Sequence, residues 1–195
     1  MAEPETTSPG LTGPTAAAPR RRPGDARPDA AAMLRVDQAG EYGATRIYAG
    51  QQAVLGAQHP AARTIARMQV QEQRHLSHFD AMMAERGVRP TLLQPFWHVA
   101  GYGLGAITAL LGPDAAMACT AAVETEIDKH YASQLHDLGD EDPELSAAIT
   151  EFRAEELEHR DIALAAGAEN AIAYPLLSSL IRAGCRVAIG LSKRI

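Results

Sequence analysis

The sequence is poor in the residues that several protein classes depend on. Aromatic residues make up 5% of its 195 residues, and Val, Ile, Thr and Tyr never gather into alternating runs, which argues against an all-β fold. The two cysteines, Cys119 and Cys185, have no metal-ligand spacing, so we expect no disulfide framework. There is no excess of positive charge: the formal net charge of −6 argues against nucleic acid as a partner.

The first thirty residues differ in composition from the rest. Residues 1–30 hold six of the twelve prolines and no aromatic residue. Such a segment buries too little apolar surface to offset the entropy of ordering it, so we expect a disordered tail over 1–30 and one domain over 31–195.

The remainder is punctuated by helix signals. Asp29, Asp114 and Asp142 are expected to cap helices, and glycines at 56, 87, 139 and 167 are expected to end them. The predicted long helices span about 29–56, 60–87, 114–139 and 142–167. Two shorter, more apolar segments cover 96–112 and 171–195, and neither has an apolar run long enough to predict a membrane span. The sequence therefore predicts an all-α bundle of four amphipathic helices with two apolar additions.

Two Glu-x-x-His pairs carry the strongest chemical signal. In Glu72/His75 and Glu156/His159 a carboxylate and an imidazole lie three residues apart, and so share one helix face. A lone glutamate precedes each pair at nearly equal spacing, because Glu41 lies 31 residues before Glu72 and Glu124 lies 32 before Glu156. The repetition is what a duplicated helix hairpin would produce.

These six residues occur on otherwise apolar helix faces. Burying four carboxylates and two imidazoles together would be prohibitive without cations. Their number and type match the carboxylate bundles that hold two iron or manganese ions. Glu155 and Glu126 compete with Glu156 and Glu124 for these roles, but the spacing favours the latter, and we expect Glu155 and Glu126 to be surface charges.

Four stretches resemble the demethoxyubiquinone hydroxylase family. They are residues 37–50, 72–75, 122–124 and 155–161, with the sequences DQAGEYGATRIYAG, EQRH, AVE and EELEHRD. The similarity covers about residues 31–195. It implies a ferritin-like four-helix bundle and two Fe ions per chain, one held by Glu41, Glu72 and His75 and the other by Glu124, Glu156 and His159. Glu72 and Glu156 are the candidates to bridge both ions.

The resemblance also implies an activity and its partners. The expected reaction is the O2-dependent hydroxylation of a ring carbon of a demethoxyubiquinol in ubiquinone biosynthesis, with the electron donor left open. The substrate would be a polyprenylated quinol. A homo-oligomer or a ubiquinone-biosynthesis complex is compatible with this reading. Iron storage by a ferritin-like bundle and a metal-free helical adaptor are the competing functions.

The two apolar segments point to a membrane surface. The segment 171–195 has no acidic residue but contains Arg182, Arg186, Lys193 and Arg194, a combination typical of an interfacial helix on anionic lipid. Covering the bundle core or a dimer interface is the alternative role for both segments. Gly101 and Gly105 are expected to allow close helix contact. Because Arg far outnumbers Lys, we expect a bacterial protein on the cytoplasmic side of the inner membrane, or on the mitochondrial inner membrane if eukaryotic.

Overall fold

A computed structural model describes residues 28–194, and over this range the protein is entirely helical. The six α-helices are α1 (Ala30–Leu55), α2 (Pro60–Arg86), α3 (Gln94–Leu110), α4 (Pro113–Leu138), α5 (Pro143–Ala165) and α6 (Tyr174–Ser192). A short 3-10 turn, η1 (Ala168–Asn170), precedes α6. Residues 1–27 of the predicted tail lie outside the described residues.

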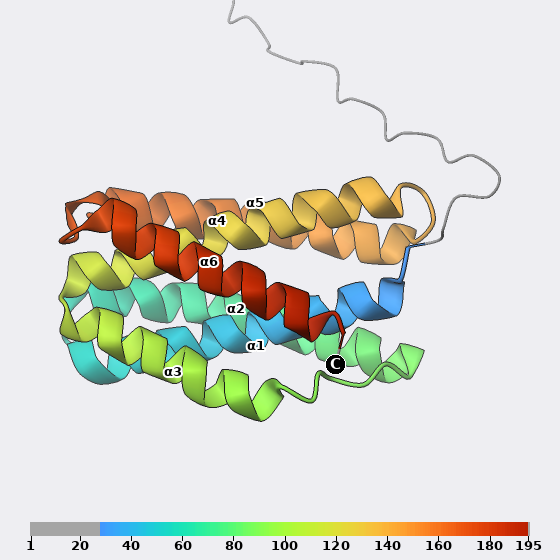
Figure 1. Ribbon diagram of the computed structural model, residues 1–195, viewed down its shortest axis with the longest axis horizontal. Helices are drawn as coiled ribbons and strands as arrows, with labels where there is room; N and C mark the ends of the chain where they lie inside the picture. The colour runs from blue at the N-terminus through green and yellow to red at the C-terminus, as the bar shows by residue number, and fades with distance from the viewer. Residues whose placement is uncertain (1–27, 195) are drawn as a thin grey trace, which may run out of the picture.

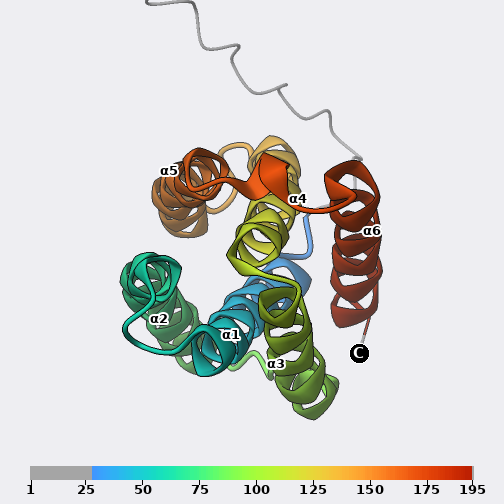
Figure 2. The ribbon, with the colours of Figure 1, turned by 90° about the vertical axis from the view of Figure 1, so that its left-hand side faces the viewer.

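Four helices form the bundle. Figure 1 shows α1 running beside α2 and α4 beside α5, each pair being an antiparallel hairpin. The end-on view in Figure 2 shows these four helices around a common centre, with α3 against α1 and α6 against α4 on the outside. The predicted ferritin-like bundle with two additional apolar helices is confirmed.

Local sequence signals explain most of the helix boundaries. The side chain of Asp29 accepts a hydrogen bond from the Ala32 amide at the start of α1, and Asp142 does the same for Leu145 at the start of α5. The prediction that Asp114 caps a helix is wrong: α4 begins at Pro113, and Gly112 is its N-cap. Asp114 lies instead in the first turn, where its charge complements the positive end of the helix.

Glycine lets α3 approach α1 closely, as predicted. A Cβ atom at Gly105 would lie 2.0 Å from the carbonyl oxygen of Ile47, and one at Gly101 would lie 3.0 Å from that of Gly43. Gly50 makes the reciprocal approach from α1, since its Cβ would meet the carbonyl oxygen of Tyr102. The backbones of the two helices therefore touch, and at Gly105 and Gly50 no larger residue fits unless the facing backbone moves.

Two of the three apolar clusters in the core are separated along the bundle axis, and the third lies between α1, α4 and α6. Of the first two, one contains Leu34, Phe79, Tyr131 and Phe152, and the other contains Tyr48, Ile65, Met68 and Met117. Each bundle helix contributes residues to both of these clusters. The glutamates at 41, 72, 124 and 156 lie between those residues, one glutamate on each helix. The fold thus places a layer of acidic groups between two layers of hydrocarbon.

Candidate metal centre

The bundle brings the six predicted ligands together at its centre. Glu41 comes from α1, Glu72 and His75 from α2, Glu124 from α4, and Glu156 and His159 from α5, and each is at most 1% exposed. Their ligand atoms form two overlapping groups, in each of which the atoms lie within 4.8 Å of one another. We call these the His75 position (Glu41, Glu72, His75, Glu156) and the His159 position (Glu72, Glu124, Glu156, His159).

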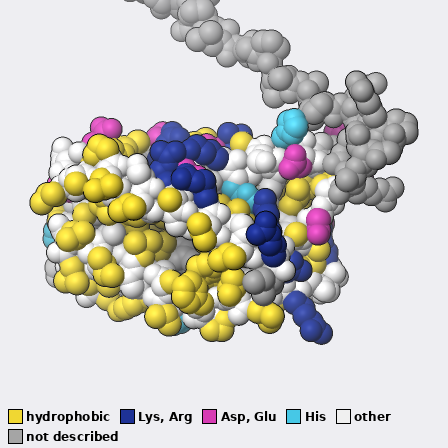
Figure 3. Space-filling view, viewed as in Figure 1, with side chains coloured by type: hydrophobic (Ala, Val, Ile, Leu, Met, Phe, Trp, Pro, Cys, Tyr) yellow, Lys and Arg dark blue, Asp and Glu magenta, His cyan; other side chains and the backbone are white. Residues whose placement is uncertain are grey.

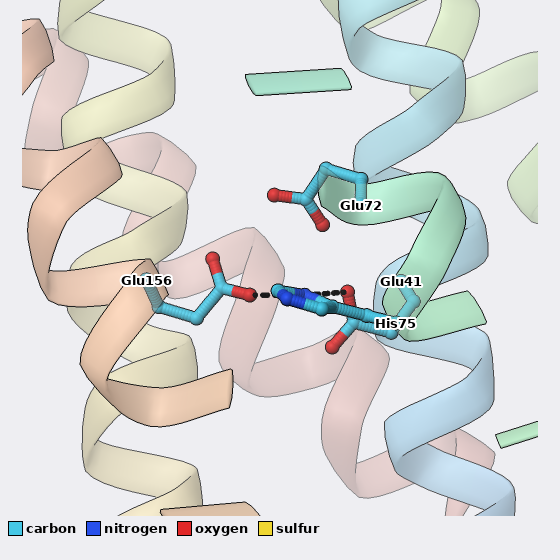
Figure 4. A group of neighbouring side chains, drawn as sticks. All are labelled: Glu41, Glu72, His75 and Glu156. Atoms are coloured by element: carbon cyan, nitrogen blue, oxygen red, sulfur yellow. Dashed lines mark ion pairs between the residues drawn. The ribbon is translucent and has the colours of Figure 1, made fainter. Parts of the chain in front are cut away.

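The two positions share Glu72 and Glu156. Figure 4 shows the His75 position, with Glu156 reaching from one side toward the imidazole and Glu41 on the other. His75 Nδ1 lies 3.0 Å from Glu156 Oε1 and 3.5 Å from Glu41 Oε2. At the His159 position, His159 Nδ1 lies 2.9 Å from Glu72 Oε1 and 3.4 Å from Glu156 Oε2. Each imidazole therefore reaches across to a glutamate of the opposite hairpin.

Most of the oxygen and nitrogen atoms that could bind a metal at the centre make no hydrogen bond within the protein. Among buried polar atoms, those without a hydrogen-bond partner include Glu41 Oε2, both oxygens of Glu72, His75 Nδ1, Glu124 Oε2, both oxygens of Glu156 and His159 Nδ1. A buried polar atom without a partner costs about 1–3 kcal/mol, and more if it is charged. A set of unpaired oxygen and nitrogen donors that converge from six side chains fits divalent metal ions, which would satisfy all of them.

The electrostatics of the centre require positive charge. Burial raises the pKa of Glu72 and Glu124 well above the usual carboxyl range, and the neighbouring carboxylate of Glu156 raises both further. Although burial lowers the pKa of His75, its contacts with Glu156 and Glu41 raise it to about 10. These shifts favour the protonated forms, whereas a divalent cation binds carboxylates and imidazole in their deprotonated forms, so metal binding would release protons.

Comparisons with known proteins agree with this arrangement. Residues 28–192 match the family described as ubiquinone biosynthesis protein COQ7. The chain belongs to this family.

Relatives come from bacteria and from mitochondria. A 3-demethoxyubiquinol 3-hydroxylase of Rhodospirillum rubrum is 55% identical over 177 residues, which cover 90% of this chain and 84% of the relative. The human NADPH-dependent 3-demethoxyubiquinone 3-hydroxylase, mitochondrial, is 54% identical over 167 residues, or 84% of this chain and 76% of the relative. The yeast 5-demethoxyubiquinone hydroxylase, mitochondrial, is 40% identical over 179 residues, with coverage of 84% and 77%.

Two tyrosines contact the lone glutamates across the bundle. The Tyr48 hydroxyl donates a hydrogen bond to Glu124 Oε1 at 2.8 Å, and the Tyr131 hydroxyl donates to Glu41 Oε1. Each tyrosine follows the lone glutamate of its own hairpin by seven residues, two helical turns. The sequence repeat that relates Glu41 to Glu124 therefore relates these tyrosines as well. The tyrosines could therefore have been found from the repeat that predicted the six glutamates and histidines.

The prediction that Glu155 and Glu126 are surface charges is wrong. Glu126 is 4% exposed and makes an ion pair with Lys129 on its own helix. Its ion pairs with Arg182 and Arg186 join α4 to α6. Glu155 lies beside the centre, where its Oε2 is 2.9 Å from His75 Nε2. Among the described residues, neither Glu126 nor Glu155 belongs to a group of candidate metal ligands. The charges predicted to be solvated instead have specific partners.

Proposed function

We propose that this protein is a di-iron monooxygenase that hydroxylates the ring of a demethoxyubiquinol in ubiquinone biosynthesis. The observation that carries the proposal is the set of unpaired, buried donor atoms shared by two overlapping groups of carboxylates and imidazoles. Membership of the COQ7 family and the activities in the names of its relatives give the reaction.

Each metal position has its own residues. Glu41 and His75 would hold one iron ion, Glu124 and His159 the other, and Glu72 and Glu156 would contact both. Oxygen and imidazole donors without thiolate suit iron better than softer metals. An iron pair bound here would supply the redox chemistry with O2 that hydroxylation requires. The protein contributes fixed ligands, tyrosine donors that orient Glu41 and Glu124, and apolar layers that exclude water.

An apolar pocket beside the centre fits the substrate. It has a volume of about 460 Å³ and lies between α1, α3, α4 and α6. Its walls are formed almost wholly by apolar side chains and glycine, as a quinol ring with a prenyl chain would need. Gly40 and Val123 line this pocket, and they directly precede Glu41 and Glu124 in the chain. A ring held in the pocket would lie close to both hairpins that carry the ligands.

The pocket is bordered by an exposed apolar surface. On α3 and α6 the large apolar side chains exposed to solvent are Phe96, Val99, Tyr102, Ile107, Leu110, Leu176, Leu180, Val187 and Leu191. Figure 3 shows hydrophobic side chains gathered over this face, with Lys and Arg side chains near its edge. Within the described residues no helix has the length and hydropathy of a membrane span.

We therefore infer that α3 and α6 rest on a membrane surface, where the polyprenylated quinol would enter the pocket from the lipid. The relatives named as mitochondrial are eukaryotic, and a bacterial inner membrane, on its cytoplasmic side, is our proposal for this chain.

Anaerobic reconstitution tests the function directly. The purified protein is loaded with Fe²⁺, supplied with a demethoxyubiquinol analogue and a reductant, and exposed to O2; iron is counted per chain, and product is detected by mass spectrometry. Two irons and a hydroxylated ring support the proposal. Two irons without product, in a large assembly that mineralises iron, would indicate storage instead. A protein that binds no iron would refute the metal centre.

Variants test the assignment of the ligands. Glu41→Ala, Glu124→Ala and His159→Ala should each abolish turnover while the far-UV circular dichroism spectrum remains helical. Retained turnover in any of them would contradict the assigned site. The division into a tail and a domain has its own test: removal of residues 1–28 leaves the Asp29 cap in place and should leave turnover unchanged.

A further inference from the structure

The two imidazoles have different partners on the side away from the metals. His75 Nε2 lies 2.9 Å from Glu155 Oε2, a carboxylate oxygen. His159 Nε2 lies 2.9 Å from Gln71 Oε1, an amide oxygen. In both cases Nδ1 faces the metal centre, so the Nε2–H group donates outward and Nδ1 is the atom that would give its lone pair to a metal.

The two partners occupy equivalent places in the sequence repeat. Gln71 directly precedes Glu72, and Glu155 directly precedes Glu156, so each stands before a Glu-x-x-His pair. Each reaches the histidine of the opposite hairpin. The six ligands and the two tyrosines repeat with identical residue types, whereas at this position one half of the molecule has an amide and the other a carboxylate.

The network fixes both orientations. The Gln71 amide nitrogen donates to Glu155 Oε2 at 3.4 Å, which turns its carbonyl oxygen toward His159. Arg74 donates to Glu155 Oε1 and holds that carboxylate from the solvent side. A chain of contacts therefore runs from His75 through Glu155 and Gln71 to His159, with its negative charge at the His75 end.

Charge on the outer partner changes what the imidazole offers a metal. A hydrogen bond to a carboxylate is about twice as strong as one to a neutral acceptor, and it increases the electron density on the opposite ring nitrogen. His75 is therefore the stronger donor of the two histidines, although both belong to the same type of ligand set.

We propose that Glu155 and Gln71 make the two metal positions unequal, so that the His75 position binds Fe²⁺ first and more tightly. Glu155 acts through His75 and is a positioning residue, not a ligand. The inference rests on the proposed di-iron site and deepens it by assigning an order to the two ions.

Anaerobic titration with Fe²⁺, followed by competition with a chelator, measures both binding steps. The wild type should bind two ions per chain in two steps whose affinities differ at least tenfold. Glu155→Gln, which keeps the shape of the side chain, should weaken the first step by about 10–100-fold and bring it close to the second. Glu151→Gln is the matched control: Glu151 also pairs with Arg74, at 3.2 Å, but makes no hydrogen bond to His75, and its variant should titrate like the wild type.

Two further backgrounds locate the effect. In a His159→Ala protein, which keeps the His75 position, Glu155→Gln should still weaken binding; in a His75→Ala protein it should change affinity less than about threefold. Mössbauer spectra of the wild type loaded with one equivalent of ⁵⁷Fe²⁺ should show a doublet whose splitting changes in Glu155→Gln but not in Glu151→Gln.

The outcomes separate this inference from the function on which it rests. Two ions bound with equal affinity, or equal effects of Glu155→Gln and Glu151→Gln, would overturn the inequality and leave the di-iron centre intact. Failure of the wild type to bind any ion would overturn both.

Discussion

At the scale of single residues, spacing was enough to select the six converging side chains but not their partners. Glu41, Glu72 and their counterparts in the second hairpin could be predicted because the repeat preserves residue type and distance. Tyr48 could have been found from the same repeat, since it matches Tyr131. The contact of Glu155 with His75 could not, because it depends on how two hairpins face each other, which no local pattern encodes.

Gly43 is expected to set the space available to the substrate ring. It lies in α1, lines the apolar pocket, and has no atom within 4 Å of the place where a Cβ would stand. Gly43→Leu should therefore fold at least as well as the wild type, because leucine favours the helix by about 1 kcal/mol over glycine. The larger side chain should raise the KM for a prenylated quinol by about tenfold or more.

Gly190 provides the matched control for this steady-state measurement. It too is a helical glycine with open space around an added Cβ, but it does not line the pocket. Gly190→Leu should leave KM unchanged. An unaltered KM in Gly43→Leu would place the ring elsewhere.

At the scale of helices, the sequence predicted the ends better than the connections. Proline and aspartate mark the starts of α2 and α5 because their effect is local. The start of α6 was missed: the apolar segment was predicted from residue 171, but Ala173, with a φ of 53°, is the N-cap of the helix, which begins at Tyr174. Left-handed backbone at an alanine is held by the surrounding packing, which composition does not reveal.

The contact between α1 and α3 should depend on Gly105. Gly105→Ala places a methyl group against the Ile47 carbonyl and should lower the free energy of unfolding by about 1–3 kcal/mol. Gly103→Ala is the control on the same helix: an added Cβ there meets nothing within 4 Å, and alanine should stabilise α3 by up to about 1 kcal/mol. Chemical denaturation of both variants measures the difference, and effects of the same sign would show that the close approach is not required.

The stabilisation from the ion pairs between α2 and α5 should depend on pH. Arg86 forms ion pairs with Asp142, the α5 cap, and with Glu144, and the Arg86 contact lowers the pKa of Asp142 despite its partial burial. A carboxyl whose pKa is depressed in the folded state stabilises the fold above its unfolded pKa of about 3.9 and loses this contribution as pH falls through the folded value.

Asp142→Asn keeps an acceptor for the cap but loses the charge. It should be about 0.5–1 kcal/mol less stable than the wild type at pH 7. The gap should narrow as the pH falls below about 4 and close once the pH is below the folded pKa of Asp142. Denaturant unfolding at several pH values checks this, with Asp161→Asn, an exposed neighbour of Arg160, as the control. A gap of the same size at every pH would assign the effect to the cap alone.

At the scale of the whole molecule, apolar side chains lie on two levels, one inside the bundle and one on its surface. Two apolar layers enclose the acidic centre, and a second apolar surface covers α3 and α6 on one side of the bundle. The pocket lies between these levels, because α1 and α4 form its inner wall and α3 and α6 its outer wall. One continuous route through apolar surroundings thus joins the exposed face to the helices that carry the ligands.

The exposed face of α6 should therefore govern binding to lipid. Val187 on α6 is 61% exposed and Val70 on α2 is 72% exposed, and Figure 2 shows these helices on opposite sides of the bundle. Val187→Asp should weaken binding to vesicles of phosphatidylcholine and phosphatidylglycerol by about tenfold, since it removes an apolar group from the interface and adds a negative charge beside anionic lipid. Val70→Asp makes the same change away from that face and should bind as the wild type does. Flotation measures the fraction of protein bound to vesicles.

The alternative is that the exposed face of α6 joins two copies of the chain, and size-exclusion chromatography of the same samples tests it. A Val187→Asp protein that binds lipid normally but no longer forms a dimer would make this face an interface between copies of the chain.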